Sequence, residues 1–265
     1  NKKGVVIINK DKYDLPTKPE KNVIGGALLA LLKEVKEDIG FTVESTKIIK
    51  PGSGIGSSSA SAAGAVVGAN RLLGNRFTNA QLIDFALCGE VIASGSQHAD
   101  NIAPCVYGGI TLIRSTNPLD IISIPSPLLY VTILHPQIEV KTSDSRGILK
   151  QTVSLKDAVT QWGNVAGLIA GLFKSDYELI GRSLVDVIVE PIRSMLIPYF
   201  DEVKKQSMLA GSLGGGISGS GPSIFMLSKD EATAKKIEQA IIGIYKNLNI
   251  DFQTHMTKIS NNGVR

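Results

Sequence analysis

Apolar residues recur along this chain with two spacings, and both spacings occur in its first and its second half. Short runs rich in β-branched residues predict strands, whereas apolar residues three and four positions apart predict helices. The predicted strands cover residues 5–8, 41–49, 109–114, 129–134, 223–227 and 252–258. Two predicted helices begin after Asn22 and after Ser154. Five more cover residues 58–73, 79–93, 177–187, 192–210 and 231–247. Strands and helices are therefore mixed in both halves.

Polar passages mark where the predicted elements end. Asn22 and Asn79 are expected to cap helices, because an asparagine oxygen can accept a hydrogen bond from a free N–H group of the first turn. Residues 94–104 are predicted to form a polar loop. The passage 115–127 is rich in serine and proline, and it predicts a boundary between a domain of residues 1–125 and a domain of residues 126–265.

The composition narrows the classes of function. The chain has 265 residues, of which 43% are hydrophobic and 20% charged, as is ordinary for a globular enzyme. Its formal net charge is +4, and only 5% of its residues are aromatic, so no nucleic-acid-binding surface is indicated. The longest apolar stretches, such as 165–173, are much shorter than the roughly 20 residues that span a bilayer. Cys88 and Cys105 lack metal-ligand spacing, and we expect both to be buried thiols in a reducing cytoplasm.

A glycine-rich stretch from Lys50 to Ala60 is the sharpest chemical feature of the sequence. Its three glycines occupy alternate positions, and glycine permits positive φ angles and a close approach of the backbone to a ligand. Three serines then open a predicted helix, whose free N–H groups and dipole favour a phosphate group. A serine hydroxyl in the first turn can reach a phosphate-bound Mg²⁺. Small residues follow and predict close packing of this helix on the loop; they are Ala60, Ala62, Ala63 and Gly64.

Better-known glycine loops do not fit this stretch. A P-loop requires lysine after its last glycine, where this chain has Ser57, and a dinucleotide-binding loop requires another glycine spacing and a later acidic residue. Residues 214–219 do have the dinucleotide spacing, but a predicted strand follows them instead of a helix. A second glycine loop that closes over a phosphate-rich site stays open for that segment. A plain Gly/Ser linker is disfavoured for residues 50–60, which run directly from a strand into a helix.

Polar side chains gather between the third predicted helix and the next strand. Glu90 ends that helix, where a carboxylate gains nothing from the dipole, and binding of Mg²⁺ would be one reason for its position. His98, Asp100 and Asn101 follow within a short span. A solvated loop is the alternative for any one of them alone, and the cluster makes a site the better interpretation.

Two arginines are candidates for binding a carboxylate. Arg146 follows the polar run 142–145, and Arg193 lies three positions after Glu190. Arginine is the natural bidentate partner of a carboxylate. Taken singly, each also fits a surface residue. His135 and His255 have no evident partner in the sequence, and we interpret both as structural.

Together these segments resemble the GHMP small-molecule kinases over nearly the whole chain. The glycine stretch resembles that family's phosphate-binding motif. Residues 89–90, 94–104 and 108–109 look like the signature of the branch that acts on homoserine, and residues 141–146, 190–193 and 217–223 follow in the expected order. The resemblance implies an α+β fold of two domains, the first like ribosomal protein S5 domain 2 and the second ferredoxin-like. It also implies ATP-dependent phosphorylation of L-homoserine to O-phospho-L-homoserine in threonine biosynthesis, in the cytoplasm.

The same resemblance implies roles for individual residues. ATP would be bound by Asn22, Lys47, Lys50, Pro51, Gly52, Ser53, Gly54, Ile55, Gly56, Ser57, Ser58, Ser59 and Ala60. Mg²⁺ would be held by Ser58 and Glu90. Homoserine would be bound by His98, Asp100, Arg146 and Arg193, with Asn101 beside the transferred phosphoryl group. Asn101, Glu90 and Ser58 are thus the catalytic candidates, and catalysis would rest on alignment and charge stabilisation without an aspartate base.

Two features depart from the family pattern. Pro51 lies one position later than in many relatives, and Lys50 occupies its usual place. The family's first strand and N-terminal substrate motif have no counterpart before Asn1, from which we expect a shortened form that binds homoserine poorly. Two alternatives stay open: a family member that acts on another small alcohol, and a non-catalytic relative that keeps the fold. The sequence also leaves a homodimer open.

Overall fold

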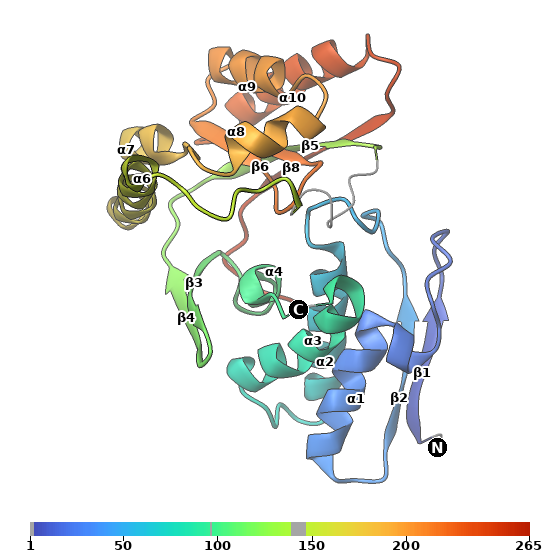
Figure 1. The fold of residues 1–265 in the computed structure, drawn as a ribbon. Helices are drawn as coiled ribbons and strands as arrows, with labels where there is room; N and C mark the ends of the chain where they lie inside the picture. Colours follow the sequence, from blue (N-terminus) through green and yellow to red (C-terminus); the bar gives the residue numbers. More distant parts are fainter. Residues whose placement is uncertain (1–2, 96, 139–146) are drawn as a thin grey trace. The chain divides into compact units, whose positions relative to one another are not determined.

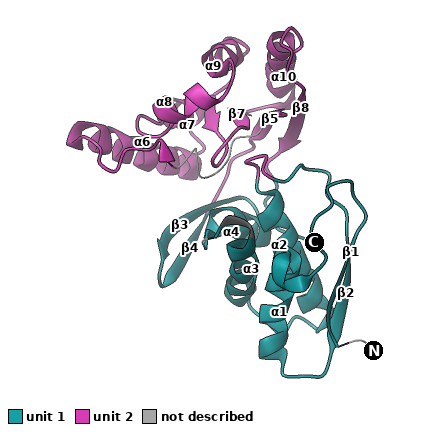
Figure 2. Ribbon diagram, turned by 45° about the vertical axis from the view of Figure 1, so that its right-hand side comes forward, with its two compact units in different colours: residues 1–51, 56–123, 260–265 teal, residues 52–55, 124–259 magenta. Residues whose placement is uncertain are grey.

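The computed structural model describes residues 3–95, 97–138 and 147–265 (Figure 1). Two compact units are formed (Figure 2). The first comprises the residues up to Pro51, residues 56–123 and residues 260–265, and the second comprises residues 52–55 and 124–259. The predicted boundary after residue 125 is close to the break after residue 123. The sequence did not indicate that residues 52–55 group with the second unit or that residues 260–265 return to the first.

The described part of the first unit contains two pairs of strands and a group of helices. β1 (Gly4–Asn9) pairs in parallel with β2 (Gly40–Ser45), and β3 (Ile110–Thr116) pairs with β4 (Leu119–Ile124). The helices are η1 (Pro19–Lys21), α1 (Val23–Val35), α2 (Ser57–Leu72), α3 (Asn79–Ser94) and α4 (Ala99–Tyr107). The register places Val5 opposite Phe41 and Ile7 opposite Val43. These apolar side chains pack on the core that the helices form.

Glycines allow α1 and α3 to cross at close range. A Cβ atom on Gly89 of α3 would lie 2.2 Å from the carbonyl oxygen of Val23, and one on Gly26 of α1 would lie 2.4 Å from Cδ1 of Ile92. Around this contact the core is fully buried; its members include Leu28, Leu31, Val66, Ile83 and Ile102. The crossing matters for function because Gly89 directly precedes Glu90.

The described part of the second unit is built on a four-stranded antiparallel sheet with the strand order β6-β7-β5-β8. The strands are β5 (Tyr130–Pro136), β6 (Gly214–Ile217), β7 (Ile224–Ser228) and β8 (Phe252–Lys258). The helices are α6 (Leu155–Lys174), α7 (Tyr177–Ser183), α8 (Glu190–Arg193), η2 (Ser194–Leu196), α9 (Phe200–Leu209) and α10 (Glu231–Tyr245). Its core joins Leu134 and Met226 of the sheet to Val203 of α9 and Ile237 of α10.

The prediction of a polar loop at residues 94–104 is wrong for its second half, where α4 begins at Ala99. The apolar residues of this segment recur at helical spacing and are buried; they are Ala99, Ile102, Ala103 and Val106. Their packing outweighs the unfavourable effect of Pro104 inside the helix. The returning C-terminal residues brace the far end of α4, where the N–H group of Val264 donates to the carbonyl oxygen of Cys105 at 2.8 Å.

Other predicted boundaries are confirmed or shifted by local chemistry. Asn22 caps α1 as predicted, but α3 is capped by Thr78, which forms a capping box with Gln81. The helix predicted at 192–210 is broken, because α8 ends at Arg193 and α9 starts only after Tyr199, whose φ angle is 58°. The strand predicted at 41–49 ends at residue 45.

The two cysteines differ from each other. Cys88 is exposed, so the prediction that it is buried is wrong, whereas Cys105 is partly buried. Burial raises the pKa of the Cys105 thiol. No helix among the described residues is both long enough and apolar enough to cross a membrane.

The α1–α3 crossing predicts a large effect of one methyl group. Gly89→Ala should lower the free energy of unfolding by about 1–3 kcal/mol, because its Cβ atom would overlap the Val23 carbonyl group. Gly68→Ala in α2 is the matched control, since no neighbouring atom lies within 4 Å of its Cβ position. It should raise the free energy of unfolding by about 0.5–1 kcal/mol. Urea unfolding followed by circular dichroism measures both changes, and equal stability of the two variants would contradict the predicted overlap.

Candidate active site

The glycine loop adopts the conformation that its sequence predicts. Gly52, Gly54 and Gly56 have φ angles of 77°, 79° and 74°, a region that is strained for residues with a side chain. A Cβ atom on Gly54 would lie 2.5 Å from the carbonyl oxygen of Gly221, and one on Gly56 would lie 3.1 Å from Oδ1 of Asn101. Gly54 is therefore required for space as well as for backbone geometry, whereas a Cβ atom on Gly56 would make a tight contact with the Asn101 side chain.

Helix α2 begins directly after this loop, with Gly56 as its N-cap residue. A glycine cap has no side chain to bond the first turn, so the leading N–H groups of α2 are left for another acceptor. Their alignment and the helix dipole favour an anion such as phosphate. Ser53 supports the same interpretation, since its hydroxyl is buried and has no hydrogen-bond partner among the described residues.

The three serines in the first turn of α2 have different surroundings. The Ser57 hydroxyl is buried and donates to the carbonyl oxygen of Ile49 at 3.0 Å. The Ser59 hydroxyl donates to Oε2 of Glu90 at 2.9 Å, and both residues are buried. Ser58 is half-buried and lies on the helix face between these two. Ser59, which the sequence assigns to the nucleotide alone, is thus a direct partner of Glu90.

The residues around Glu90 fit a divalent cation that is held mainly by another ligand. Among the described residues, no group of three or more His, Cys, Asp or Glu side chains could hold a metal ion. Mg²⁺ commonly takes only one or two carboxylates together with water and substrate phosphates. A single carboxylate that is 7% exposed, beside serine hydroxyls and a helix start that favours phosphate, suits Mg²⁺ bound to a nucleotide.

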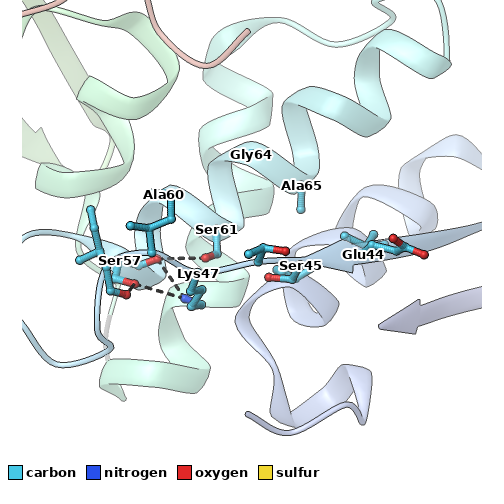
Figure 3. A pocket seen from close by; sticks show the side chains of 13 residues that line it. Glu44, Ser45, Lys47, Ser57, Ala60, Ser61, Gly64 and Ala65 are labelled. Atoms are coloured by element: carbon cyan, nitrogen blue, oxygen red, sulfur yellow. Dashed lines mark hydrogen bonds between the residues drawn. The ribbon is translucent and has the colours of Figure 1, made fainter. Parts of the chain in front are cut away.

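A cavity of about 440 Å³ lies beside the first turns of α2 (Figure 3). Ala60, Ser61, Gly64 and Ala65 of α2 line one side, and residues 43–49 line the other. Cavities of this size bind small molecules. The small residues of α2 therefore have two roles instead of the single predicted one. Ala62 and Ala63 fill the core, whereas Ala60 and Gly64 leave this space open.

Lys47 lines the cavity with its ammonium group directed to the start of α2 (Figure 3). Its Nζ donates to the carbonyl oxygen of Ser57 at 3.1 Å, and its backbone N–H group donates to Oδ2 of Asp11 at 3.0 Å. Burial lowers the pKa of Lys47, and the carboxylates of Asp11 and Glu90 act in the opposite direction. A partly desolvated cation next to the helix start is suited to bind phosphate oxygens.

Other residues predicted to bind the nucleotide have structural partners or lie elsewhere. Oδ1 of Asn22 accepts from the N–H group of Ile24 at 2.9 Å, and its Nδ2 donates to the carbonyl oxygen of Pro16 at 2.6 Å. Both groups of this buried amide therefore already hold the start of α1. Of the described residues, those that line the cavity include Ile24 but not Asn22, nor the half-buried Lys50, Pro51 and Ile55.

Helix α4 carries three of the predicted substrate and catalytic residues. The side chain of Asn101 lies against Gly56 at the base of the glycine loop. Oδ1 of Asp100 accepts hydrogen bonds from the backbone and the side chain of Asn101, at 3.1 and 3.3 Å. His98 is the N-cap residue of α4 and is half-buried. Asp100 and Asn101 thus belong to a helix and not to a loop, and His98 directly precedes it.

In the second unit, the loop between β6 and β7 bonds to the glycine loop. The Ser223 hydroxyl donates to the carbonyl oxygen of Ser53 at 2.6 Å, and the Ser218 hydroxyl donates to that of Gly54 at 2.8 Å. Sequence reasoning had left open that this second glycine-rich segment closes over phosphate. The structure shows that serines of this segment hold carbonyl groups of the first loop, and closure over phosphate stays a prediction.

Arg193 also lies in the second unit, at the end of α8. Its guanidinium donates to the carbonyl oxygen of Gly219 at 3.3 Å, and it lines a cavity of about 350 Å³ together with Glu190. Burial raises the pKa of Glu190, although the ion pair with Lys204 acts against this shift. The second predicted arginine, Arg146, lies outside the described residues.

The structure therefore brings several predicted residues together in the first unit: Gly56, Ser57, Lys47, Glu90 and Asn101. Asp11, which the sequence analysis does not single out, supports Lys47 in this unit. Two more residues that it does not single out, Ser218 and Ser223, bond to residues 54 and 53 of the glycine loop within the second unit. The glycines around the two serines signalled an unusual loop. Asp11 carried no signal, because a single aspartate in a polar segment is typical of a surface residue.

Known proteins share this fold and these segments. Residues 22–109 match the GHMP kinases N terminal domain, and residues 168–247 match the GHMP kinases C terminal domain. The homoserine kinase of Chlorobium phaeobacteroides (strain BS1) is 46% identical over 258 residues, which cover 95% of this chain and 81% of that protein. The homoserine kinase of Chloroherpeton thalassium is 45% identical, and the match covers 100% of this chain and 86% of that protein.

Solved structures of kinases are also similar to this chain. The crystal structure of homoserine kinase from Cytophaga hutchinsonii is similar to this chain with a TM-score of 0.95 at 48% identity, covering 99% of this chain and 84% of that one. A mevalonate kinase from L. major has a TM-score of 0.70 at 18% identity, covering 96% of this chain and 82% of that one. At that identity the second comparison speaks for the fold alone.

The buried carboxylate leads to a prediction about turnover. Glu90→Gln should lower kcat for phosphoryl transfer by roughly 100-fold or more, because it removes a charge that would hold Mg²⁺ yet keeps an acceptor for Ser59. Ser59→Ala is the control, since it keeps the charge and loses only the 2.9 Å hydrogen bond. Its kcat should fall by about tenfold at most. Normal turnover of Glu90→Gln at saturating Mg²⁺ would show that Glu90 is not a metal ligand.

The lowered pKa of Lys47 predicts a pH dependence. A lysine is charged below its pKa, so the cation that attracts phosphate is lost when the pH rises through this lowered value. The ratio kcat/KM for ATP should therefore decrease at a lower pH than for an ordinary lysine, whose pKa is about 10.4. Lys47→Arg keeps its charge and should remove this decrease. A wild-type profile that stays flat until ordinary lysines titrate, with circular dichroism unchanged, would contradict the assignment.

Proposed function

Since this chain belongs to the GHMP kinase family, we propose that it transfers the γ-phosphoryl group of ATP to the hydroxyl group of L-homoserine. The products are ADP and O-phospho-L-homoserine, and the reaction is a step of threonine biosynthesis. The observation that carries the proposal is the junction of the glycine loop with α2, where Lys47 and Glu90 lie beside free helix N–H groups. The acceptor is inferred from relatives that are 43–46% identical over most of the chain and are named homoserine kinases.

ATP binds with its phosphate groups at the glycine loop and the first turn of α2. The backbone N–H groups there donate to phosphate oxygens, and the ammonium group of Lys47 adds a positive charge. The cavity of about 440 Å³ beside α2 takes the nucleoside. This assignment is supported by the small side chains that keep the cavity open along one face of α2.

Glu90 and Ser58 are the residues that would hold Mg²⁺. The ion supplies charge neutralisation for the phosphoryl group in transfer. Glu90 suits this role because water does not screen its buried charge, and because the Ser59 hydroxyl fixes the orientation of its carboxylate. Ser58 suits this role because it lies in the same helical turn as Ser59 and is only half-buried.

The acceptor has a carboxylate, an ammonium group and a hydroxyl group, and the chain offers partners for the two charged groups. Arg146 and Arg193 are suited to the carboxylate, and Asp100 to the ammonium group. His98 is assigned to the acceptor as well. Asn101, which lies against Gly56, can donate from its amide to the phosphoryl group in transfer. The rate enhancement then comes from alignment of the hydroxyl with the γ-phosphorus and from stabilisation of charge, as phosphoryl transfer requires.

A coupled ADP-release assay over a panel of alcohols tests the proposed function. We expect L-homoserine to give the highest kcat/KM, with mevalonate and shikimate turned over far more slowly. A higher kcat/KM for one of these alcohols would assign the chain to another branch of the family. No ADP release with any acceptor, from protein that binds ATP and Mg²⁺, would favour a non-catalytic relative.

Two further expectations belong to the proposal. We place the enzyme in the cytoplasm, where ATP is supplied and where the two free thiols are stable. The homodimer stays a prediction, which one surface feature supports. Helix α6 carries exposed apolar side chains at helical spacing, namely Leu155, Val159, Trp162 and Phe173, and such surfaces are often buried on association.

The assignment of the arginines predicts a selective effect on one substrate. Arg146→Ala and Arg193→Ala should each raise KM for homoserine by roughly 30- to 150-fold, the equivalent of about 2–3 kcal/mol for a lost charged hydrogen bond. The KM for ATP should stay almost unchanged. Arg182→Ala, at an exposed position in α7, is the matched control and should change neither constant. If Arg193→Ala weakens both substrates equally, its bond to Gly219 is structural and the assignment fails.

A further inference from the structure

His135 is a buried residue of β5 that the sequence offered no partner for. His135 is 2% exposed, and its Nδ1 lies 3.1 Å from the Ser223 hydroxyl oxygen. The same hydroxyl oxygen lies 2.6 Å from the carbonyl oxygen of Ser53 in the glycine loop. An imidazole, a hydroxyl and a loop carbonyl group are thus connected in series, and all three residues belong to the second unit.

The direction of these two hydrogen bonds follows from counting protons. A serine hydroxyl has one proton, and a carbonyl oxygen can only accept. Two oxygens at 2.6 Å need a proton between them, so Ser223 donates its proton to Ser53. Ser223 then has none left for His135. The short contact between Nδ1 and the hydroxyl oxygen therefore requires that Nδ1 carries a proton and donates it to Ser223.

We propose that His135 is a positioning residue for the phosphate-binding loop and acts through Ser223. A serine hydroxyl rotates to suit its neighbours, and the donor at Nδ1 leaves the Ser223 hydroxyl one favourable direction, which is toward Ser53. Hydrogen bonds in series also strengthen one another. The carbonyl group of Ser53 is thereby held before ATP binds, so less ordering is required on binding. The effect on ATP rests on the proposed function, whereas the bonding scheme does not.

The protonated nitrogen of His135 can be observed directly. The chain has three histidines, so protein labelled with ¹⁵N-histidine gives three sets of ring signals, and the set lost in His135→Asn identifies this residue. Long-range ¹H–¹⁵N correlations report which ring nitrogen carries the proton. We expect a protonated Nδ1. A ring with an unprotonated Nδ1 would overturn the proposal, whatever the activity of the protein.

Two substitutions at this position separate hydrogen bonding from packing. His135→Leu fills the buried position with an apolar side chain and removes the donor, whereas the amide of His135→Asn places a donor close to the position of Nδ1. We expect His135→Leu to weaken ATP binding about tenfold, which corresponds to about 1.4 kcal/mol, and to leave KM for homoserine within about twofold. His135→Asn should restore most of the ATP affinity. In a Ser223→Ala background, His135→Leu should cause no further loss, because the two residues act through one path.

The possible results distinguish this inference from the proposed function. Equal losses of ATP affinity and thermal stability in His135→Leu and His135→Asn would assign His135 to packing and overturn the positioning role. Unchanged ATP affinity in His135→Leu would do the same. Wild-type protein that binds ATP without phosphorylating homoserine would refute the proposed function. In that case calorimetry with ATP alone still decides the role of His135.

Discussion

At Gly54 a side chain would meet the carbonyl oxygen of Gly221 at 2.5 Å, and at Gly56 it would meet the amide oxygen of Asn101 at 3.1 Å. The loop backbone therefore leaves no room for a Cβ atom at Gly54 and little at Gly56, and its φ angles are ones that only glycine adopts without strain. This steric constraint fixes where the loop ends and where α2 begins. Once α2 begins at Ser57, the directions of its first side chains and N–H groups are fixed as well. The rest of the candidate site is arranged around that helix start.

The first turn of α2 places three identical serine side chains in different surroundings. Successive residues are rotated by about 100°, so Ser57 bonds to Ile49 near Lys47, and Ser59 bonds to Glu90. A cation and a carboxylate thus flank the same turn, and Glu90 opposes the fall in the pKa of Lys47. This arrangement suits a ligand that itself combines phosphate oxygens with a cation. A site built for phosphate alone would gain nothing from a buried carboxylate, which would repel the anion.

The features that sequence reasoning predicted well are those with a strong local cause. The caps of α1 and α6 and the conformation of the glycine loop follow from residues within a few positions of one another. The helix α4 was missed because its polar first residues and Pro104 suggest a loop, and only tertiary packing shows that its apolar residues are buried. The pairing of Ser59 with Glu90 could not be predicted either. A pattern places a helix start within one or two residues, and an error of one residue turns a side chain by 100°.

The contacts that hold the loop illustrate a second limit. Ser218 and Ser223 lie 164 and 170 residues from the carbonyl groups that they bond, so no local pattern links them. The register of the second unit's sheet helps to position Ser223. Leu134 of β5 is paired with Ile224 of β7, and one step further along the same antiparallel register His135 meets Ser223.

A shift of this register by one residue would turn His135 to the opposite face of the sheet and break its connection to Ser53. The position of Ser223, which bonds to the glycine loop, therefore depends on correct pairing of two strands far from that loop in sequence. Such long-range contacts form only after distant segments have been ordered, because the loop-closure entropy must first be overcome. It follows that the glycine loop has its backbone preferences from its own sequence, but it is held in one position only when the second unit is folded.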